Sequence, residues 1–174
     1  NLEVRHGELY SGKYSEVFPN VCSSRIWVKQ ELRKFENLIL ACEKWATIAW
    51  LLGLPYPEDE FKNNWKKVLW GAFHDIAPGT GMDEAYEEAK DNFALLQSRL
   101  PEILRGFLSF ISRNLRSQED IIVFNPLAWE VTNWVEVELG FGEGQIKRIE
   151  GLTSNRASLE AEILEFTRYA DDSY

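Results

Sequence analysis

The sequence has little of what marks several specialised classes of protein. Its longest apolar run, around residues 46–54, is well short of the roughly 20 residues that a membrane-spanning helix needs, and no signal peptide is recognisable at its start. Its 19 lysines and arginines are spread along the chain beside 28 acidic residues, and the net charge is −9. We therefore expect neither a membrane nor a nucleic acid among its partners.

Cysteine is equally scarce, with Cys22 and Cys42 the only two. One helix is predicted below for residues 24–52, and its rise of about 1.5 Å per residue would hold the two thiols about 30 Å apart. A disulfide needs Cα atoms within about 7 Å. An intrachain bridge is therefore excluded if that helix forms. Unpaired thiols favour a reducing compartment, and we expect a cytoplasmic protein.

Hydrophobic residues, by contrast, make up 45% of the chain and include seven tryptophans, which is enough to bury a core. In residues 24–52, 58–75 and 80–115 they recur at spacings of three and four, the pattern of amphipathic helices. The predicted inner faces are Ile26, Leu32, Phe35, Leu38, Ile39, Cys42, Trp45, Ala46 and Ala49; Phe61, Trp65, Val68, Leu69 and Ala72; and Met82, Tyr86, Ala89, Phe93, Leu96, Ile103, Leu104, Phe107, Leu108 and Ile111.

The predicted helix ends follow from local signals. The serines at 23–24 can cap the first helix, and Pro57, followed by three acidic residues, can open the second. The spacing of Thr80 and Asp83 resembles a capping box at the start of the third. Pro101 should kink or break that third helix.

After residue 117 the apolar spacing changes to short runs of the kind found in β-strands. Such runs occupy residues 121–126, 130–139, 145–150 and 161–169, with Gly-rich or Ser/Asn-rich turns between them. The predicted fold is therefore mainly α: a three-helix up-down-up bundle, followed by short antiparallel β-strands that open a β domain.

One pair of residues stands out as a candidate site. His74 and Asp75 occupy the predicted end of the second helix, just before Pro78 and Gly79. Adjacent helical residues point about 100° apart, so we expect one to face a metal or a proton and the other a hydroxyl. The sequence has no CxxC or HExxH motif, and zinc needs three or four ligands. Any metal site must therefore be completed from outside this chain.

Plainer interpretations remain open beside this one. Isolated His-Asp pairs are common, so His74 could be an ordinary histidine whose neighbour accepts bonds from the next turn. His6 is a weaker candidate, and we expect an ordinary residue there. Trp129 and Trp134 could line a sugar platform, but a role in a β core is favoured. A solvated helix face, rather than a cation site, is expected for Asp83, Glu84, Glu87, Glu88 and Asp91.

Several longer segments carry a resemblance. GELYSGKY (7–14), SSRIWVKQELRKFENLILACEKWA (23–46) and YPEDEFKNNWKKVLWGAFHDIAPGTG (56–81) resemble the central region of glycoside hydrolase family 38, the α-mannosidases. VFNPLAWEVTNWVEV (123–137) resembles the opening of that family's C-terminal β region. The chain differs at Gly71-Ala72, where the family commonly has an Asn-Gln pair that could support the site.

The resemblance implies a layout in which the chain is a fragment of a longer enzyme. Residues 1–20 would be the tail of a preceding catalytic barrel, residues 21–117 the three-helix middle domain, and residues 118–174 the start of a β-sandwich-like C-terminal region. The chain's partners would then be its own missing barrel and, through bundle surface left exposed, a second copy in a homo-oligomer.

The resemblance also implies an activity. Members are zinc-dependent retaining glycosidases that hydrolyse terminal α-mannosides, with His74 matching a zinc ligand and Asp75 a carboxylate that binds sugar hydroxyls. The other zinc ligands and both catalytic carboxylates belong to the barrel, so this chain should be inactive alone. Two alternatives stay open: a mannosylglycerate hydrolase of the same fold, and a non-enzymatic helical scaffold or oligomerisation module.

Overall fold

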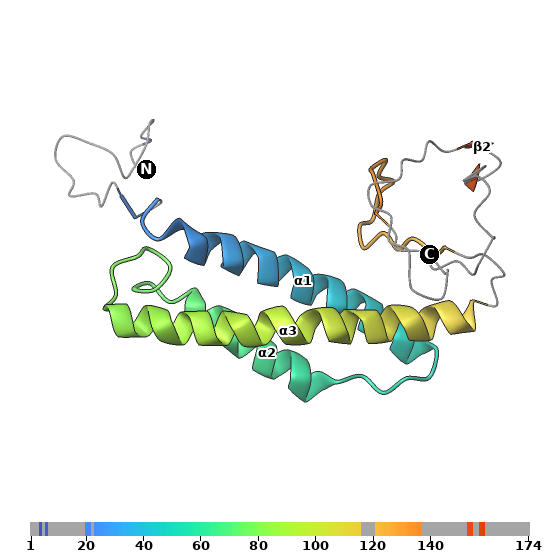
Figure 1. Ribbon diagram of the computed structural model, residues 1–174, viewed down its shortest axis with the longest axis horizontal. Helices are drawn as coiled ribbons and strands as arrows, with labels where there is room; N and C mark the ends of the chain where they lie inside the picture. The colour runs from blue at the N-terminus through green and yellow to red at the C-terminus, as the bar shows by residue number, and fades with distance from the viewer. Residues whose placement is uncertain are drawn as a thin grey trace, which may run out of the picture. The chain divides into compact units, whose positions relative to one another are not determined.

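A computed structural model describes residues 4, 6, 20–21, 23–115, 121–136, 153–154 and 157–158. Three helices account for most of them: α1 (Ile26–Leu51), α2 (Glu58–Gly71) and α3 (Asp83–Asn114). The helices run up, down and up (Figure 1), and each packs against the other two. The predicted three-helix bundle and the mainly helical character are confirmed.

The core of the bundle is formed by the apolar stripes that the periodicity predicts. Ile26, Leu69, Ala72 and Met82 are exposed instead, because the first lies at a helix end, the second at the rim and the last two outside the helices. The buried apolar residues of the helices are Val28, Leu32, Phe35, Ile39, Cys42, Ala46 and Ala49 of α1; Phe61 and Val68 of α2; and Tyr86, Ala89, Phe93, Leu96, Leu100, Phe107 and Ile111 of α3.

Gly71 lets the end of α2 approach the other two helices closely. A Cβ atom at this position would lie 2.8 Å from Cζ of Phe93 and 3.2 Å from a methyl group of Leu32, which is closer than van der Waals contact allows. A larger residue at position 71 would therefore require the ring of Phe93 to shift.

Both predicted N-caps are wrong. The cap of α1 is Arg25 in the left-handed conformation, with φ 46° and ψ 51° and no capping side chain. The cap of α3 is Met82, also without a side-chain hydrogen bond. The physical reason is that the backbone before each helix makes contacts with other segments. Ser24 lies against Gly79, where an added Cβ atom would be 2.7 Å from Cβ of Ser24. The amide of Gly81, just before α3, donates a 3.1 Å hydrogen bond to the hydroxyl of Tyr86.

Pro101 was predicted to kink or break the third helix; a break is wrong, because α3 continues through it. A proline removes one hydrogen bond of the helix ladder. Leu100, Phe107 and Ile111 are buried on either side of this point, and that packing holds the helix together, since tertiary contacts supply most of the stability of helices in proteins.

Cys42 is a free thiol buried under α3. Its Sγ lies 3.6 Å from the carbonyl oxygen of Leu100, and burial, with a smaller effect from Glu43, raises its pKa to about 11. A thiol with such a pKa is a poor nucleophile and metal ligand at neutral pH. Cys22 lies outside the described residues, so the distance between the two cysteines stays a prediction.

The β-strands predicted after the bundle are not confirmed. Residues 121–136 are irregular, with a bend at 127–129. Among the described residues no second segment forms a ladder with them, and an isolated strand is not stable. The runs at 145–150 and 161–169 lie outside the described residues. Where a turn was expected, two antiparallel two-residue strands pair instead, β1 (Thr153–Ser154) and β2 (Ala157–Ser158), with Thr153 opposite Ser158.

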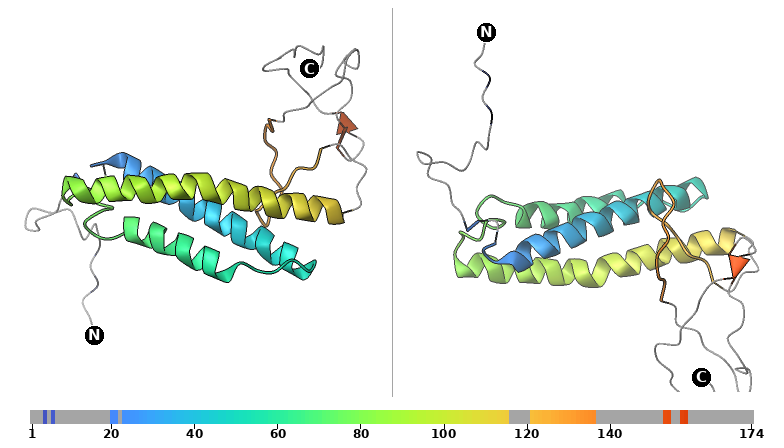
Figure 2. Two further views of the ribbon diagram at one scale, coloured as in Figure 1. Left: turned by 60° about the horizontal axis from the view of Figure 1, so that its bottom comes forward. Right: turned by 90° about the horizontal axis from the view of Figure 1, so that it is seen from above.

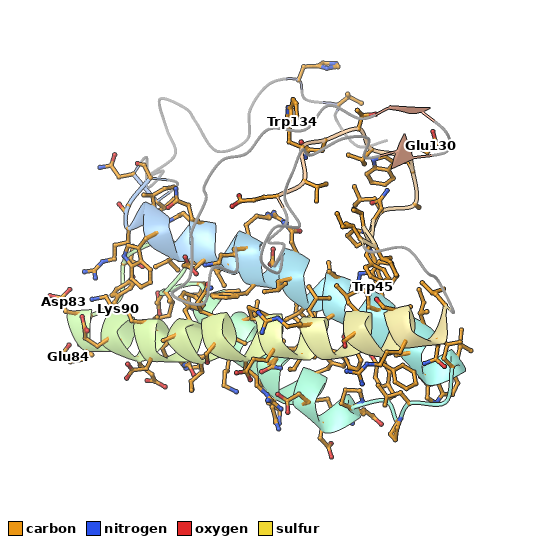
Figure 3. All side chains as sticks on the ribbon, turned by 45° about the vertical axis from the view of Figure 1, so that its right-hand side comes forward. Trp45, Asp83, Glu84, Lys90, Glu130 and Trp134 are labelled. Carbon is orange, nitrogen blue, oxygen red and sulfur yellow. The ribbon has the colours of Figure 1, made fainter. Side chains whose placement is uncertain are left out.

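The start of this irregular stretch packs on α1 rather than in a sheet. The rings of Phe124 and Trp45 meet edge to face with centroids 5.1 Å apart, and Lys44 Nζ donates a 3.0 Å hydrogen bond to the carbonyl of Pro126. Figure 3 labels Trp45 on α1. Trp129 and Trp134 are 65% and 76% exposed, so neither is buried among the described residues, and the expected β-core role stays a prediction.

Two compact units divide the chain, Asn1–Glu130 and Val131–Tyr174. The first contains the bundle and the segment that packs on it. The functional boundaries predicted at residues 20 and 117 stay predictions. Within the described part of the chain, no helix combines the length and the apolar character needed to cross a membrane.

Candidate functional site

His74 and Asp75 lie in the connection between α2 and α3, at the same end of the bundle as the start of α1 (Figures 1 and 2). The second helix ends at Gly71, earlier than predicted, and residues 72–79 form a series of turns and a bend. The amide of Ile76 donates to the carbonyl of Phe73 at 2.9 Å, and the amide of Gly79 to that of Ile76 at 3.1 Å. The pair therefore lies on a turn rather than on a helix.

The two side chains are exposed and close together. Nε2 of His74 lies 3.6 Å from Oδ2 of Asp75, and the side chains are 77% and 57% exposed. The expected divergence of about 100° is wrong, because it applies to helical neighbours. Since 3.6 Å is too long for a hydrogen bond, the pair is not locked together. Both polar ends are available to an outside partner.

The main chain beneath the pair is fixed by several hydrogen bonds. The carbonyl of Asp75 accepts from the amide of Gly81 at 2.8 Å and from the hydroxyl of Tyr86 at 3.0 Å. The same hydroxyl lies 3.3 Å from the carbonyl of Ile76 and accepts from the amide of Gly81 at 3.1 Å. The turn thus presents exposed side chains from an ordered backbone.

Arg25 connects this turn to the start of α1. Its guanidinium lies over the ring of Tyr86, 3.7 Å from the centroid, and forms an ion pair with Asp83 in the first turn of α3. The hydrogen bond from Arg25 lowers the pKa of Asp83. Figure 3 shows Asp83 at the outer end of α3. Arg25 therefore contacts both Tyr86, whose hydroxyl holds the turn, and the first turn of α3.

Gly79 allows the turn to pass close to the start of α1. Its φ is +89°, and a Cβ atom there would lie 2.7 Å from Cβ of Ser24. Both the backbone conformation and the close approach require glycine. In the sequence, Pro78-Gly79 predicts only a helix stop, and its second function, contact with residue 24, is visible only in the structure.

Replacing Gly79 with alanine should destabilise the chain more than the same change at Gly53. Gly53 has φ +100°, but a Cβ atom added there would have nothing within 4 Å, so Gly53→Ala adds backbone strain alone, about 1 kcal/mol. Gly79→Ala adds the clash with Ser24 and should cost about 2–4 kcal/mol. Urea unfolding of both variants measures the difference. Equal losses would show that the turn yields without cost.

The described residues hold no complete metal site. No group of three or more histidine, cysteine, aspartate or glutamate side chains is close enough to bind an ion within this part of the chain. Zinc takes three or four protein ligands, so His74 and Asp75 can be only part of a site. His6, the weaker candidate, is exposed.

The acidic run at the start of α3 is a solvated face, as predicted. All five carboxylates are exposed; Asp83 pairs with Arg25, and Glu87 pairs with Lys90 at 2.7 Å.

A hollow of about 580 Å³ lies elsewhere, between the α1–α2 connection and the second half of α3. It contains the ion pair of Arg99 with Glu60, whose hydrogen bond lowers the pKa of Glu60.

Tyr86 is the residue of this site that sequence reasoning missed. Its place in the apolar stripe predicted burial, and it is 1% exposed, but its hydroxyl was assigned no partner. A signal was present, because the hydroxyl of a buried tyrosine usually finds a hydrogen-bond partner. The three main-chain partners could not be foreseen from helical spacing.

Taken together, fold and site define a helical module that presents a histidine and an aspartate at one end. The family model of the alpha mannosidase middle domain matches residues 16–111, more than half of the chain, and the chain belongs to this family. The match spans α1, α2, the His74–Asp75 turn and nearly all of α3. The resemblance to glycoside hydrolase family 38 is confirmed. No curated protein sequence gives a significant match to the chain.

Proposed function

We propose that this chain supplies one wall of the active site of a zinc-dependent retaining α-mannosidase acting on terminal α-mannosides. One observation carries the proposal: the region that matches the alpha mannosidase middle domain contains the ordered turn on which His74 and Asp75 are exposed together. Exposed polar side chains on a rigid backbone suit a surface that completes a site with another domain.

His74 fits the role of a single zinc ligand. A neutral imidazole is a common zinc ligand, and the ring is exposed at the end of the bundle with no hydrogen bond to Asp75. The remaining ligands would come from a preceding barrel domain. Zinc, when bound in such a site, orients neighbouring hydroxyls of the sugar. The part of this chain is to hold one nitrogen ligand in place.

Asp75 fits the role of a sugar-binding residue. An ionised carboxylate accepts hydrogen bonds and donates none, and bonds from a hydroxyl to a carboxylate are stronger than those between neutral groups. Its place beside His74 lets the two side chains contact adjacent atoms of one sugar ring. The nucleophile and the general acid of a retaining mechanism would lie in the barrel, so we expect this chain alone to be inactive.

Replacing Asp75 with asparagine tests this role. Asp75→Asn should lower kcat/KM for an aryl α-mannoside about 10- to 100-fold, because a hydrogen bond to a charged group contributes about 1.5–3 kcal/mol. The assay uses the longer enzyme that contains the barrel, and the bound zinc should stay unchanged. Asp91→Asn, on the exposed face of α3, is the matched control. Equal rates for the two variants would contradict the role of Asp75.

The same assay separates the alternatives. Hydrolysis of mannosylglycerate in preference to the aryl α-mannoside would identify the other substrate class of this fold. A longer protein without hydrolytic activity on either would favour the helical scaffold. For a scaffold, the exposed Leu51 and Leu69 would lie between copies of the chain in a homo-oligomer. In the proposed enzyme, the bundle would instead have the preceding barrel as its partner.

A further inference from the structure

We propose that Tyr86 is a positioning residue for the site: its buried hydroxyl fixes the turn that presents His74 and Asp75, and Arg25 holds the ring in place. This inference rests on the proposed function, because it gives the turn a reason to be rigid. It concerns a residue that contacts neither side chain of the pair and acts only through the main chain.

The hydroxyl of Tyr86 is used more fully than packing would require. It accepts from the amide of Gly81 at 3.1 Å, and its single proton is shared between the carbonyls of Asp75, at 3.0 Å, and Ile76, at 3.3 Å. These groups come from both sides of the turn, before and after Gly79. The hydroxyl therefore links the two arms of the turn to α3.

The turn has further attachments beside this hydroxyl: Ala77 is partly buried against the core, and Thr80 Oγ1 donates a 3.5 Å hydrogen bond to the carbonyl of Asp75. Ile76 is the buried apolar side chain of this connection, at 4% exposure. Phe73 is about half exposed, and its ring lies tilted against that of His74 with centroids 4.1 Å apart.

A buried side chain anchors one point of a turn, and hydrogen bonds to the backbone fix its direction. The hydrogen bonds to the carbonyl of Asp75 from the amide of Gly81 (2.8 Å) and the hydroxyl of Tyr86 (3.0 Å) are shorter than the one from Thr80 Oγ1 (3.5 Å). The orientation of Asp75 thus depends mainly on Tyr86 and on the amide of Gly81.

The ring of Tyr86 is itself held from two sides. The guanidinium of Arg25 lies on its face at 3.7 Å, and Trp27 meets it edge to face with centroids 6.3 Å apart. A cation on an aromatic face and an edge-to-face contact are both favourable arrangements. Because Arg25 also pairs with Asp83, a shift of the ring would disturb the starts of both α1 and α3.

Phenylalanine at position 86 separates positioning from packing. Tyr86→Phe keeps the ring and the contact with Arg25 but removes every hydrogen bond of the hydroxyl. The matched control is Tyr56→Phe, since Tyr56 lies in the α1–α2 connection, at the other end of the bundle. Both variants lose one phenolic hydroxyl, and Tyr86→Phe alone changes the His74–Asp75 turn.

The first measurement is amide hydrogen exchange in the 174-residue chain. Exchange at Gly81 should become at least about tenfold faster in Tyr86→Phe, because local opening of the turn becomes easier, while exchange at Leu96 in the middle of α3 stays unchanged. Tyr56→Phe should leave both amides as they are. An unchanged rate at Gly81 would overturn the proposal. An equal increase at Leu96 would do the same, since it would mean general destabilisation.

The second measurement is made on the longer enzyme that contains the barrel. Tyr86→Phe should weaken zinc binding roughly 10- to 100-fold, the usual effect of losing a group that orients a ligand, and kcat/KM should fall with it. Unchanged zinc affinity and rate, beside faster exchange at Gly81, would overturn the positioning role while leaving the proposed function intact. Retention of zinc in His74→Ala would instead overturn the proposed function, and the exchange result would still decide whether Tyr86 fixes the turn.

A second variant keeps the test decisive if Tyr86→Phe unfolds. Arg25→Lys keeps the positive charge near Asp83 but loses the planar group that stacks on the ring. Exchange at Gly81 should then rise about threefold, in the same direction as for Tyr86→Phe but less. No increase would show that Arg25 does not hold the ring.

Discussion

In the zinc-dependent α-mannosidase that we propose for this chain, His74→Ala is expected to remove most of the zinc and to lower kcat/KM about a thousandfold or more. A bound metal supplies several kcal/mol of stabilisation, and each 1.36 kcal/mol corresponds to a factor of ten in rate. The fold should be unaffected, because the side chain is 77% exposed and forms no part of the core.

His6→Ala is the control for this experiment, since His6 is the other histidine of the chain and is exposed. It should leave zinc content and rate unchanged. The 174-residue chain alone should bind zinc weakly at most, because one imidazole and one carboxylate do not complete a site. A His74→Ala enzyme with normal zinc content and normal rate would show that the histidine is structural. Tight, stoichiometric zinc in the isolated chain would contradict the shared site.

Replacing Phe35 with alanine is expected to lower the free energy of unfolding by about 3–5 kcal/mol, more than any of the substitutions in the turns or on the surface. Phe35 is fully buried in the middle of α1, and its ring lies 5.6 Å from that of Phe93 on α3. Removal of the ring leaves a cavity between two long helices that cannot both move to fill it. Such a loss is a large part of the 5–15 kcal/mol that typically stabilises a domain.

Urea unfolding followed by circular dichroism measures this loss. Leu40→Ala is the matched control: Leu40 lies on the same helix and is 45% exposed, so its truncation should cost less than about 1 kcal/mol. Similar losses for the two variants would mean that the α1–α3 contact is not the centre of the core.

The helices of this fold could be predicted from the sequence because they follow a local rule. The spacing of Phe35, Ile39 and Cys42 is enough to identify the buried face of α1. The helix ends could not be predicted in the same way. Arg25 and Met82 occupy the cap positions because the backbone before each helix makes contacts elsewhere: Ser24 with Gly79, and Gly81 with Tyr86. Contacts between segments that are distant in sequence cannot be predicted from the residues next to the helix end. The strands predicted at 121–139 depend likewise on a partner strand, which local alternation cannot supply.

The candidate site was predictable in part. His74 and Asp75 were identified by their rarity and by the resemblance to a known family, and the family is confirmed. The predicted angle of about 100° between their side chains is wrong, because it assumes that α2 continues to residue 75, whereas α2 ends at Gly71. Tyr86 was placed correctly in the core, but its hydroxyl was overlooked, since hydrophobic periodicity treats tyrosine as an apolar side chain and ignores its polar end.

The partnership of α1 with α3 has a consequence for the newly made chain. Cys42 and Leu100, which meet in the core, are 58 residues apart in sequence. At a translation rate of about 5–20 residues per second, α3 can therefore cover its part of the apolar face of α1 only on the order of 3–12 s after that face is made. During that interval the nascent chain exposes apolar surface of α1, so we expect a holdase chaperone to bind it before the bundle is complete.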